Sequence, residues 1–189
     1  MLPIRYEKLN PGNFGVHSLD NFIRHQAVRE VWRESGGVWR LVPEAFEENW
    51  DFEKCRETAA DIKMHMQSDQ SAFGAFDGSR LVGFVTVSHA LFGKTARYAQ
   101  LVCFQVSEPY RGRGIGRALF MRAAEEAKRL GAERLYISAH SSRESQAAYR
   151  ALGCLLAAEI NETLAGQEPC DVQMEYRLTG QKDGKEREV

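Results

Sequence analysis

The chain has 189 residues, with 25 basic and 26 acidic side chains and a net charge of -1 at pH 7. Hydrophobic residues make up 43% and charged residues 27%, an ordinary balance for one compact domain of this size. This balance excludes a globally basic nucleic-acid-binding protein and an acidic disordered chain. The apolar stretch at 81–87 is far shorter than the ~20 residues that a membrane span needs.

The sequence shows no targeting signal and no closely spaced cysteines. The N-terminal residues 1–5 contain no long apolar core, so we expect no signal peptide. The cysteines lie too far apart to form a zinc-type or redox-type pair: Cys55, Cys103, Cys154 and Cys170. We therefore expect reduced thiols, no metal, no membrane or nucleic-acid partner, and a cytoplasmic protein.

The first third of the chain predicts one strand followed by two helices. A strand at 4–9 ends at Asn10-Pro11-Gly12, which is a turn signal. Ser18 is placed to cap a helix that runs through Trp32 and ends at Gly36-Gly37, with a short strand at 38–42 after it. Asp51 is placed to cap a second helix that reaches about residue 66.

From residue 72 the pattern is first β-rich and then alternating. Strands at 72–76 and 81–87 flank Asp77-Gly78, which predicts a hairpin turn. The later elements are a strand at 97–106, a helix at 115–130, a strand at 135–139, a helix at 142–152, and strands at 155–160 and 172–178. This order predicts an α+β domain, a three-layer α/β arrangement with a mixed, mostly antiparallel sheet and helices on both faces. We expect one domain at 1–178 and a polar tail at 179–189.

A glycine-rich turn joins the strand at 97–106 to the following helix. It reads Tyr110-Arg111-Gly112-Arg113-Gly114-Ile115-Gly116-Arg117. Alternate glycines let the backbone approach a ligand closely, and a helix start favours negative charge. Four arginines and no acid lie between Pro109 and Ala124, so the turn predicts a polyphosphate site. A turn with solvated arginines is the alternative. The third glycine of a dinucleotide fingerprint and the Gly-Lys-Ser/Thr of a P-loop are absent.

This turn resembles the central motif of the GNAT acetyltransferase superfamily, Arg/Gln-x-x-Gly-x-Gly/Ala after a strand. The resemblance covers roughly residues 72–178 and implies acetyl-CoA wedged where two central strands splay apart. It implies that the backbone of Phe104, Gln105 and Val106 holds the pantetheine arm. It also implies that the loop from Arg111 to Arg117 holds the pyrophosphate.

A second segment, at 142–153, resembles the family's Asn-x-x-Ala-x-x-x-Tyr-x-x-x-Gly-Phe helix. Tyr149 and Gly153 keep the family spacing, which implies that Tyr149 protonates the leaving CoA thiolate. Three positions depart from the pattern: Ser142 for Asn, Ser145 for Ala and Cys154 for Phe. We expect Ser142 and Ser145 to contact the CoA arm, with helix capping as the equal alternative for Ser142.

The general base is less clearly marked. Direct acyl transfer needs a neutral amine, so a group must remove a proton. Many family members carry a carboxylate on one of the two central strands, but 97–106 and 135–139 contain none. His140 is our candidate, because histidine changes charge near neutral pH. The rivals are His89, Glu168, Asp171 and water.

Aromatic and acidic residues gather in the predicted acceptor-side helices at 18–66. All three tryptophans and seven carboxylates lie between Phe22 and Glu53, which suits a cationic amine; a solvated acidic face is the alternative. We expect an N-acetyltransferase that moves the acetyl group of acetyl-CoA to a primary amine of a small, cationic acceptor by direct attack. The alternatives are a non-catalytic acyl-CoA sensor and an enzyme for protein or peptide amines. Monomer and homodimer both remain open.

Overall fold

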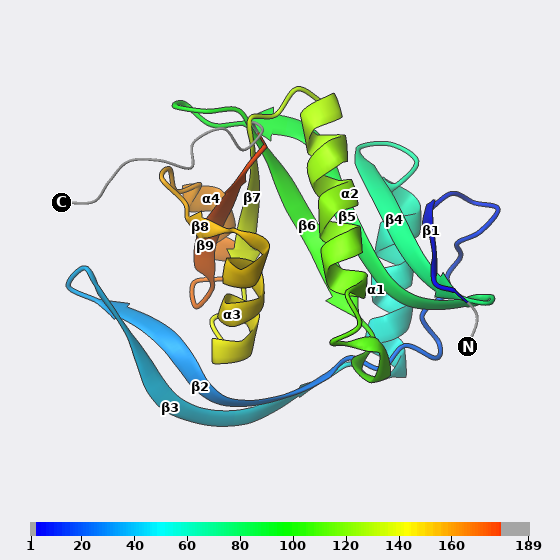
Figure 1. Cartoon of the computed structure of the whole chain (residues 1–189), viewed down its shortest axis with the longest axis horizontal. Helices are drawn as coiled ribbons and strands as arrows, with labels where there is room; N and C mark the ends of the chain where they lie inside the picture. The colour runs from blue at the N-terminus through cyan, green and yellow to red at the C-terminus, as the bar shows by residue number, and fades with distance from the viewer. Residues whose placement is uncertain (1–2, 179–189) are drawn as a thin grey trace.

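The computed structural model describes residues 3–178, and a seven-stranded sheet lies at its centre (Figure 1). The strands, in sheet order, are β1 (Arg5–Lys8), β4 (Gln70–Asp77), β5 (Arg80–Phe92), β6 (Tyr98–Val106), β7 (Arg134–Ala139), β9 (Val172–Arg177) and β8 (Leu155–Leu156). Neighbouring strands run antiparallel except β6 and β7, which are parallel. The predicted mixed, mostly antiparallel sheet is confirmed. The predicted tail at 179–189 lies outside the described residues.

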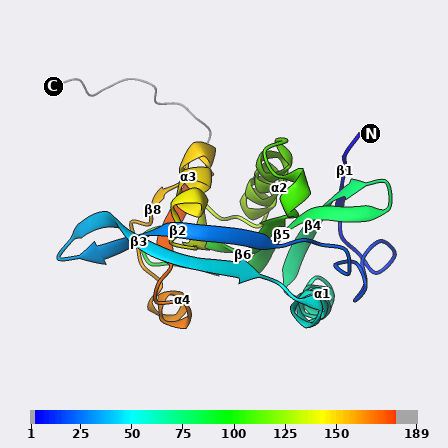
Figure 2. The same cartoon turned by 90° about the horizontal axis from the view of Figure 1, so that it is seen from below.

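Helices cover both faces of this sheet, as predicted. Figure 2 shows α2 (Ile115–Arg129) and α3 (Arg143–Leu152) on one face, with α1 (Phe52–His65) and α4 (Glu162–Gln167) on the other. Asp51 caps α1 by accepting a hydrogen bond from the Lys54 N–H at 2.7 Å. None of the described helices is long and apolar enough to cross a membrane.

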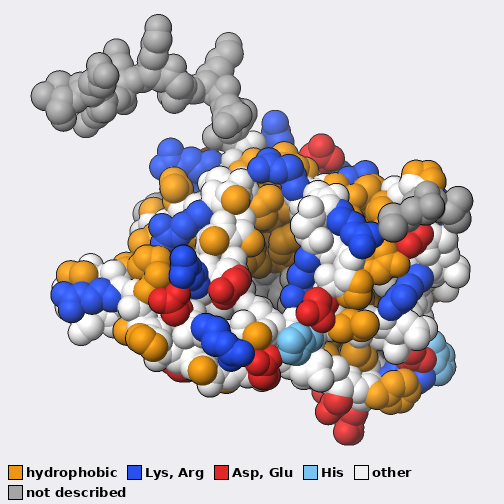
Figure 3. All heavy atoms as spheres, turned by 60° about the horizontal axis from the view of Figure 1, so that its bottom comes forward, with side chains coloured by type: hydrophobic (Ala, Val, Ile, Leu, Met, Phe, Trp, Pro, Cys, Tyr) orange, Lys and Arg blue, Asp and Glu red, His pale blue; other side chains and the backbone are white. Residues whose placement is uncertain are grey.

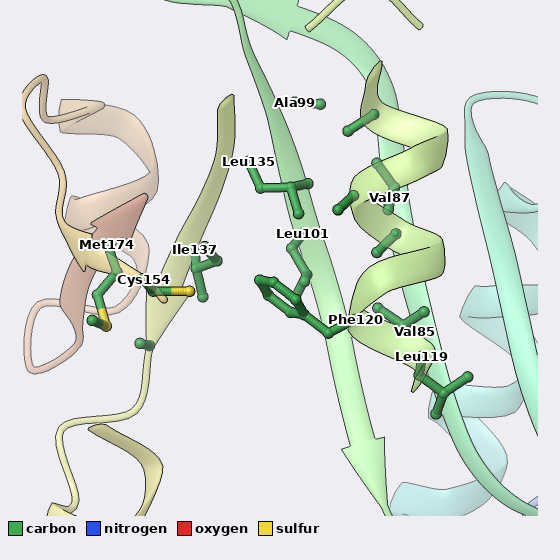
Figure 4. Close-up of a cluster of buried hydrophobic side chains, with 14 of the residues drawn as sticks. Val85, Val87, Ala99, Leu101, Leu119, Phe120, Leu135, Ile137, Cys154 and Met174 are labelled. Atoms are coloured by element: carbon green, nitrogen blue, oxygen red, sulfur yellow. The ribbon is translucent and has the colours of Figure 1, made fainter. Parts of the chain in front are cut away.

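The core lies mainly between α2 and the sheet. Leu119 and Phe120 of α2 are fully buried and pack with Val85 and Leu101 of the sheet (Figure 4). Burying each such side chain contributes roughly 1.5–3 kcal/mol. This packing places the first turn of α2 at the end of β6, beside the glycine-rich turn.

The segment at 18–50 corrects the sequence prediction, because it forms no helix. A long two-stranded hairpin occupies it, made of β2 (His25–Ser35) and β3 (Val38–Asn49). Gly36 and Gly37 have φ values of 60° and 82°, and a tight hairpin turn needs positive φ at both positions. These glycines therefore turn the chain between two strands and do not end a helix. Of the predicted acceptor-side helices only α1 exists.

The β2–β3 hairpin bridges the ends of β6 and β7 (Figures 1 and 2). Near its start, the Ile23 carbonyl accepts from the Glu108 N–H at 2.8 Å, just after β6. Farther along, the Trp32 N–H donates to the Ser141 carbonyl at 2.8 Å, just after β7. The hairpin therefore lies across the gap between the two central strands.

The last third contains a second correction. The predicted strand at 155–160 is only the two-residue β8, and the chain then leaves the sheet for α4. Asn161 caps α4 by accepting from the N–H groups of Thr163 and Leu164. An asparagine favours a helix start because its side chain bonds these N–H groups, a signal that the strand prediction overlooked.

Candidate active site

The two central strands separate to form a cleft. β6 and β7 are paired only where 98–100 lies beside 134–136, and beyond this point they diverge. The cleft has a volume of about 780 Å³ and is lined by residues 101–105 of β6, one side of α3, the start of β2 and the segment before β9. Figure 3 shows a hollow with hydrophobic side chains inside it and charged side chains around its rim.

The edge of β6 directs backbone groups into this cleft. The Ser107 N–H donates to the Val82 carbonyl of β5 at 2.9 Å. Because successive residues of an antiparallel strand direct their N–H and C=O groups to opposite sides, Val106 and Phe104 direct theirs away from β5. Gln105 directs its backbone groups toward β5 and lines the cleft with its side chain. Phe104 and Val106, two of the three residues predicted to hold the pantetheine arm, thus direct their backbone groups away from β5, toward the side on which β7 lies.

The glycine-rich turn leaves space for an anion at the start of α2. Gly112 and Gly114 have φ values of 73° and 79°, and a Cβ atom added to either would meet no atom within 4 Å. Gly114 occupies the N-cap of α2 and supplies no side-chain cap, so no capping side chain covers the first N–H groups of the helix. A helix start of this kind, together with its dipole, fits a phosphate group.

The arginines in the turn and in the following helix make contacts within the protein. Arg111 donates to the backbone carbonyls of Val106 and His25, and Arg117 donates to the Ala151 carbonyl. Arg122 lies over the Tyr6 ring at 4.3 Å, and Arg113 lies over the Tyr110 ring at 5.1 Å. Their positive charge still surrounds the turn, but the geometry that suits a pyrophosphate comes from the backbone.

Tyr149 lies on the α3 wall of the cleft. Its ring lies 6.2 Å from that of Phe104 on β6. Burial raises the pKa of Tyr149 above its ordinary value, with smaller contributions from Cys154, Cys103 and Asp171. The phenol therefore keeps its proton at neutral pH and can act as a proton donor.

Glu168 and Asp171 form a carboxyl pair in the same cleft. Burial, a hydrogen bond with Glu168, and the charges of Glu168 and Glu48 raise the pKa of Asp171 to about 8. Two carboxyl groups in contact cannot easily ionise together, so the pair holds one proton near neutral pH. Asp171 acts electrostatically on Tyr149 and Glu168 on Cys103, and all four side chains line the cleft.

His140 also lines the cleft, but both of its ring nitrogens are engaged. Nδ1 accepts from the Ser142 N–H at 3.1 Å, and Nε2 lies 3.3 Å from a Glu48 oxygen. Both ring nitrogens therefore already have partners within the protein.

The other predicted polar residues are placed in different ways. Ser142 is buried, caps α3 through Ser145, and accepts from the Gln26 side chain at 2.8 Å, in line with the capping alternative. Ser145 lines the cleft beside Tyr149. His89 does not line it, and contacts Ser71 at 3.0 Å instead.

Sequence reasoning did not single out two of the charged residues in the cleft. Arg24 is 8% exposed, and its Nη2 lies 2.6 Å from Glu48 Oε2. Glu48 is one of the seven carboxylates noted between residues 22 and 53, but most of the others pair elsewhere. Glu30 pairs with Arg143 and Glu44 with Arg33, for example. No sequence signal separates Glu48 from them, because only the β2–β3 hairpin turns it into the cleft.

A model of the acetyltransferase (GNAT) family matches residues 35–154. The chain belongs to this family. It is therefore an acyltransferase, and the cleft between β6 and β7 lies where the resemblance implied acetyl-CoA. A comparison with curated proteins gives no match. Among residues 3–178, no group of three or more His, Cys, Asp or Glu side chains is placed to hold a metal ion.

Solved structures share the GNAT fold over nearly the whole chain. Nourseothricin acetyltransferase has a TM-score of 0.68 at 22% identity, covering 93% of this chain and 98% of its own. PaiA N-acetyltransferase of Thermoplasma acidophilum, solved with coenzyme A, has a TM-score of 0.58 at 20% identity, and the match covers 93% of this chain and 99% of that chain. The ribosomal-protein-S18-alanine N-acetyltransferase of Escherichia coli has a TM-score of 0.56 at 14% identity, and the match covers 98% of this chain and 100% of that chain. At these identities the likeness concerns the fold, and the three names imply different acceptors.

Proposed function

We propose that this protein transfers the acetyl group of acetyl-CoA to a primary amine of a small, cationic acceptor, with Tyr149 as the acid and the Glu168–Asp171 pair as the base. The observation that carries this proposal is the presence of both groups in one cleft, beside the open edge of β6. The family supplies the reaction class, and the side chains of this cleft supply the roles.

Acetyl-CoA fits the cleft through backbone groups. The start of α2 receives the pyrophosphate, and the cleft-facing groups of Phe104 and Val106 bind the pantetheine arm by strand-like hydrogen bonds. The Val106 N–H is placed to polarise the thioester carbonyl, since the Val106 carbonyl is already used by Arg111.

The acetyl group passes directly to the amine. Burial raises the pKa of the Cys103 thiol to about 12, so this nearby sulfur is not a thiolate nucleophile at neutral pH. The amine nitrogen bonds to the carbonyl carbon, the C–S bond breaks, and its electron pair leaves on sulfur. Tyr149 gives its proton to that sulfur, and the carboxyl pair takes the proton that the nitrogen loses. Proton return through solvent restores Tyr149 and the pair.

A cationic acceptor is supported by the acidic side chains of the cleft. Glu48, Glu168 and Asp171 line it together, and Trp50 offers an aromatic face beside them. An arriving ammonium group is attracted by these carboxylates, loses one proton to solvent, and reacts as the neutral amine. At saturating acetyl-CoA, the acceptor KM should therefore rise with salt.

The test is release of the CoA thiol with four amines: spermidine, an aminoglycoside, L-lysine and a peptide with a free N-terminus. We expect turnover of at least one small amine, with kcat/KM rising as the pH increases through about 8, where Asp171 loses its proton. Asp171→Asn should lower the rate ~10²-fold or more and change the dependence of kcat/KM on pH near 8. His140→Gln should keep the pH dependence of the unmodified enzyme. Turnover of the peptide alone would contradict a small acceptor, and an unaltered profile in Asp171→Asn would remove the carboxyl pair from the mechanism.

A further inference from the structure

The side chain of Arg24 uses only part of its hydrogen-bonding capacity. Its Nη2 lies 2.6 Å from Glu48 Oε2, but Nε and Nη1 are shielded from solvent and meet no hydrogen-bond partner among residues 3–178. A guanidinium group offers five N–H donors in a fixed fork, and buried donors are nearly always paired in folded proteins. Two nitrogens of this cleft-lining side chain therefore need an acceptor oxygen.

The protein around Arg24 does not supply that oxygen. Glu48 offers one carboxylate to two basic side chains, because its second oxygen faces His140 at 3.3 Å. Arg111 lies close enough that the Arg24 charge, after burial, helps to lower its pKa, so a second positive charge is nearby. Glu48 Oε2 is also buried and has no hydrogen-bond partner in the described part of the chain beyond its ion pair with Nη2, so two nitrogens of Arg24 face one available oxygen, and donors exceed acceptors.

Acidic side chains line the same cleft. Glu168 and Asp171 lie there with Tyr149, and the charge of Glu48, which contacts Arg24, acts on Asp171. A ligand bound in the cleft can therefore meet both an acidic group and the Arg24 fork.

We propose that Arg24 binds an oxygen of the acceptor, so that the acceptor is an aminoacyl compound: a molecule with a carboxylate or amide carbonyl in addition to the reacting amine. This proposal rests on the acetyl transfer proposed above, and it adds the second group that the acceptor carries. Glu48 holds only one nitrogen of the fork, so rotation about the Arg24 side-chain torsions can bring Nε and Nη1 to the oxygen.

L-lysine, L-lysinamide and cadaverine test the proposal, because they share one carbon chain and two amines and only cadaverine lacks the oxygen. We expect kcat/KM for lysine and lysinamide to exceed that for cadaverine about tenfold or more, as for a hydrogen bond to a charged group. A higher value for lysine than for lysinamide would show that the oxygen is a carboxylate. Equal values for all three compounds would overturn the proposal.

Variants locate the effect. Arg24→Lys keeps the positive charge beside Glu48 but removes the fork. It should therefore lower kcat/KM for lysine and lysinamide to the value for cadaverine. The acceptor KM should rise, and the acetyl-CoA KM should not change. Arg29→Lys is the matched control, because Arg29 lies on β2 with its side chain 65% exposed, and it should keep the preference. A preference that survives in a folded Arg24→Lys protein would assign the oxygen to another residue.

Binding separates this proposal from the proposed function. The Trp50 side chain can report occupancy by its fluorescence, because Trp50 lines the cleft and its backbone N–H donates to the Arg24 carbonyl at 3.0 Å. If no amine is acetylated but lysine still binds more tightly than cadaverine, and Arg24→Lys removes the difference, acetyl transfer fails and the Arg24 site stands. If binding shows no difference, the Arg24 site fails whatever the turnover, and the buried donors are satisfied by water. Trp50→Phe identifies the reporting tryptophan.

Discussion

The Arg111 side chain ties the glycine-rich turn to the β2–β3 hairpin, since its Nη1 donates to the His25 backbone carbonyl at 2.7 Å. Its Nε donates to the Val106 carbonyl at 3.0 Å, so one guanidinium links the end of β6 to the start of β2. Burial lowers the pKa of Arg111, as expected for a cation partly withdrawn from water. An arginine that the motif associates with the pyrophosphate thus also holds the cleft together.

Replacing Arg111 with alanine should loosen this junction. Two solvent-exposed hydrogen bonds are lost, and we expect a loss of about 1–2 kcal/mol in the free energy of unfolding, measured by denaturant titration. Hydrogen exchange should rise at the start of β2. Arg40→Ala, at an exposed position of the same hairpin, should change stability by less than ~0.5 kcal/mol. Equal effects of the two variants would contradict the role of Arg111.

Gly114→Glu should weaken coenzyme A binding about tenfold or more. The new carboxylate lies at the start of α2, where a phosphate is expected, and repels it. The matched control is Gly78→Glu, because Gly78 also has a positive φ and open space around its Cβ position but lies in the β4–β5 turn. Calorimetry on both folded variants separates charge at the site from backbone strain. Unchanged affinity in Gly114→Glu would exclude the turn as the phosphate site.

Tyr149→Phe should lower kcat ~10²-fold or more while coenzyme A affinity stays constant, because only the proton donor is removed. The measurement must be made where chemistry limits the rate. Tyr176→Phe serves as the control, since Tyr176 packs its ring on Phe120 at 5.1 Å within the core. A Tyr149→Phe enzyme with nearly full kcat would assign this side chain to packing.

Asp171 should make stability depend on pH. Its pKa is about 8 in the folded protein and near 3.8 when unfolded, so between these values the folded state holds a proton that the unfolded state has released. The free energy of unfolding therefore falls as the pH rises from about 4 to about 8, and above about 8 it falls no further through this group. Asp171→Asn should remove this decline and raise Tm at pH 9 more than at pH 5. Parallel Tm curves for the two proteins would contradict the shifted carboxyl group.

Ser142→Ala should reduce stability more than function. Loss of an N-cap costs about 1 kcal/mol, which corresponds to a fall in Tm of roughly 2–4 °C for a chain of this size, and the acetyl-CoA KM should not change. Ser145→Ala is the complementary variant, because Ser145 lines the cleft. A raised acetyl-CoA KM in Ser142→Ala would instead support the CoA-contact alternative.

The sequence alone determined the family, the core elements and the glycine-rich turn, because each depends on neighbours in the chain. The spacing of Gly112 and Gly114 before an amphipathic helix, and that of Tyr149 and Gly153, are local signals, and the structure contains both elements. The Asp77-Gly78 hairpin and the Asp51 cap are equally local and were predicted correctly.

Only the tertiary structure decided how the segment at 18–50 folds and which charged side chains it brings into the cleft. The segment at 18–35 contains helix-compatible residues, and its strand state depends on pairing with β3 and on bonds to Ser141 and Ser142 more than a hundred residues away. The surroundings of the base candidates could not be read from the sequence either: His140 has partners at both ring nitrogens, while a hydrogen bond with Glu168 contributes to the raised pKa of Asp171. Arg24 carried no sequence signal at all, because an unpaired buried donor exists only once the surrounding chain has folded around it.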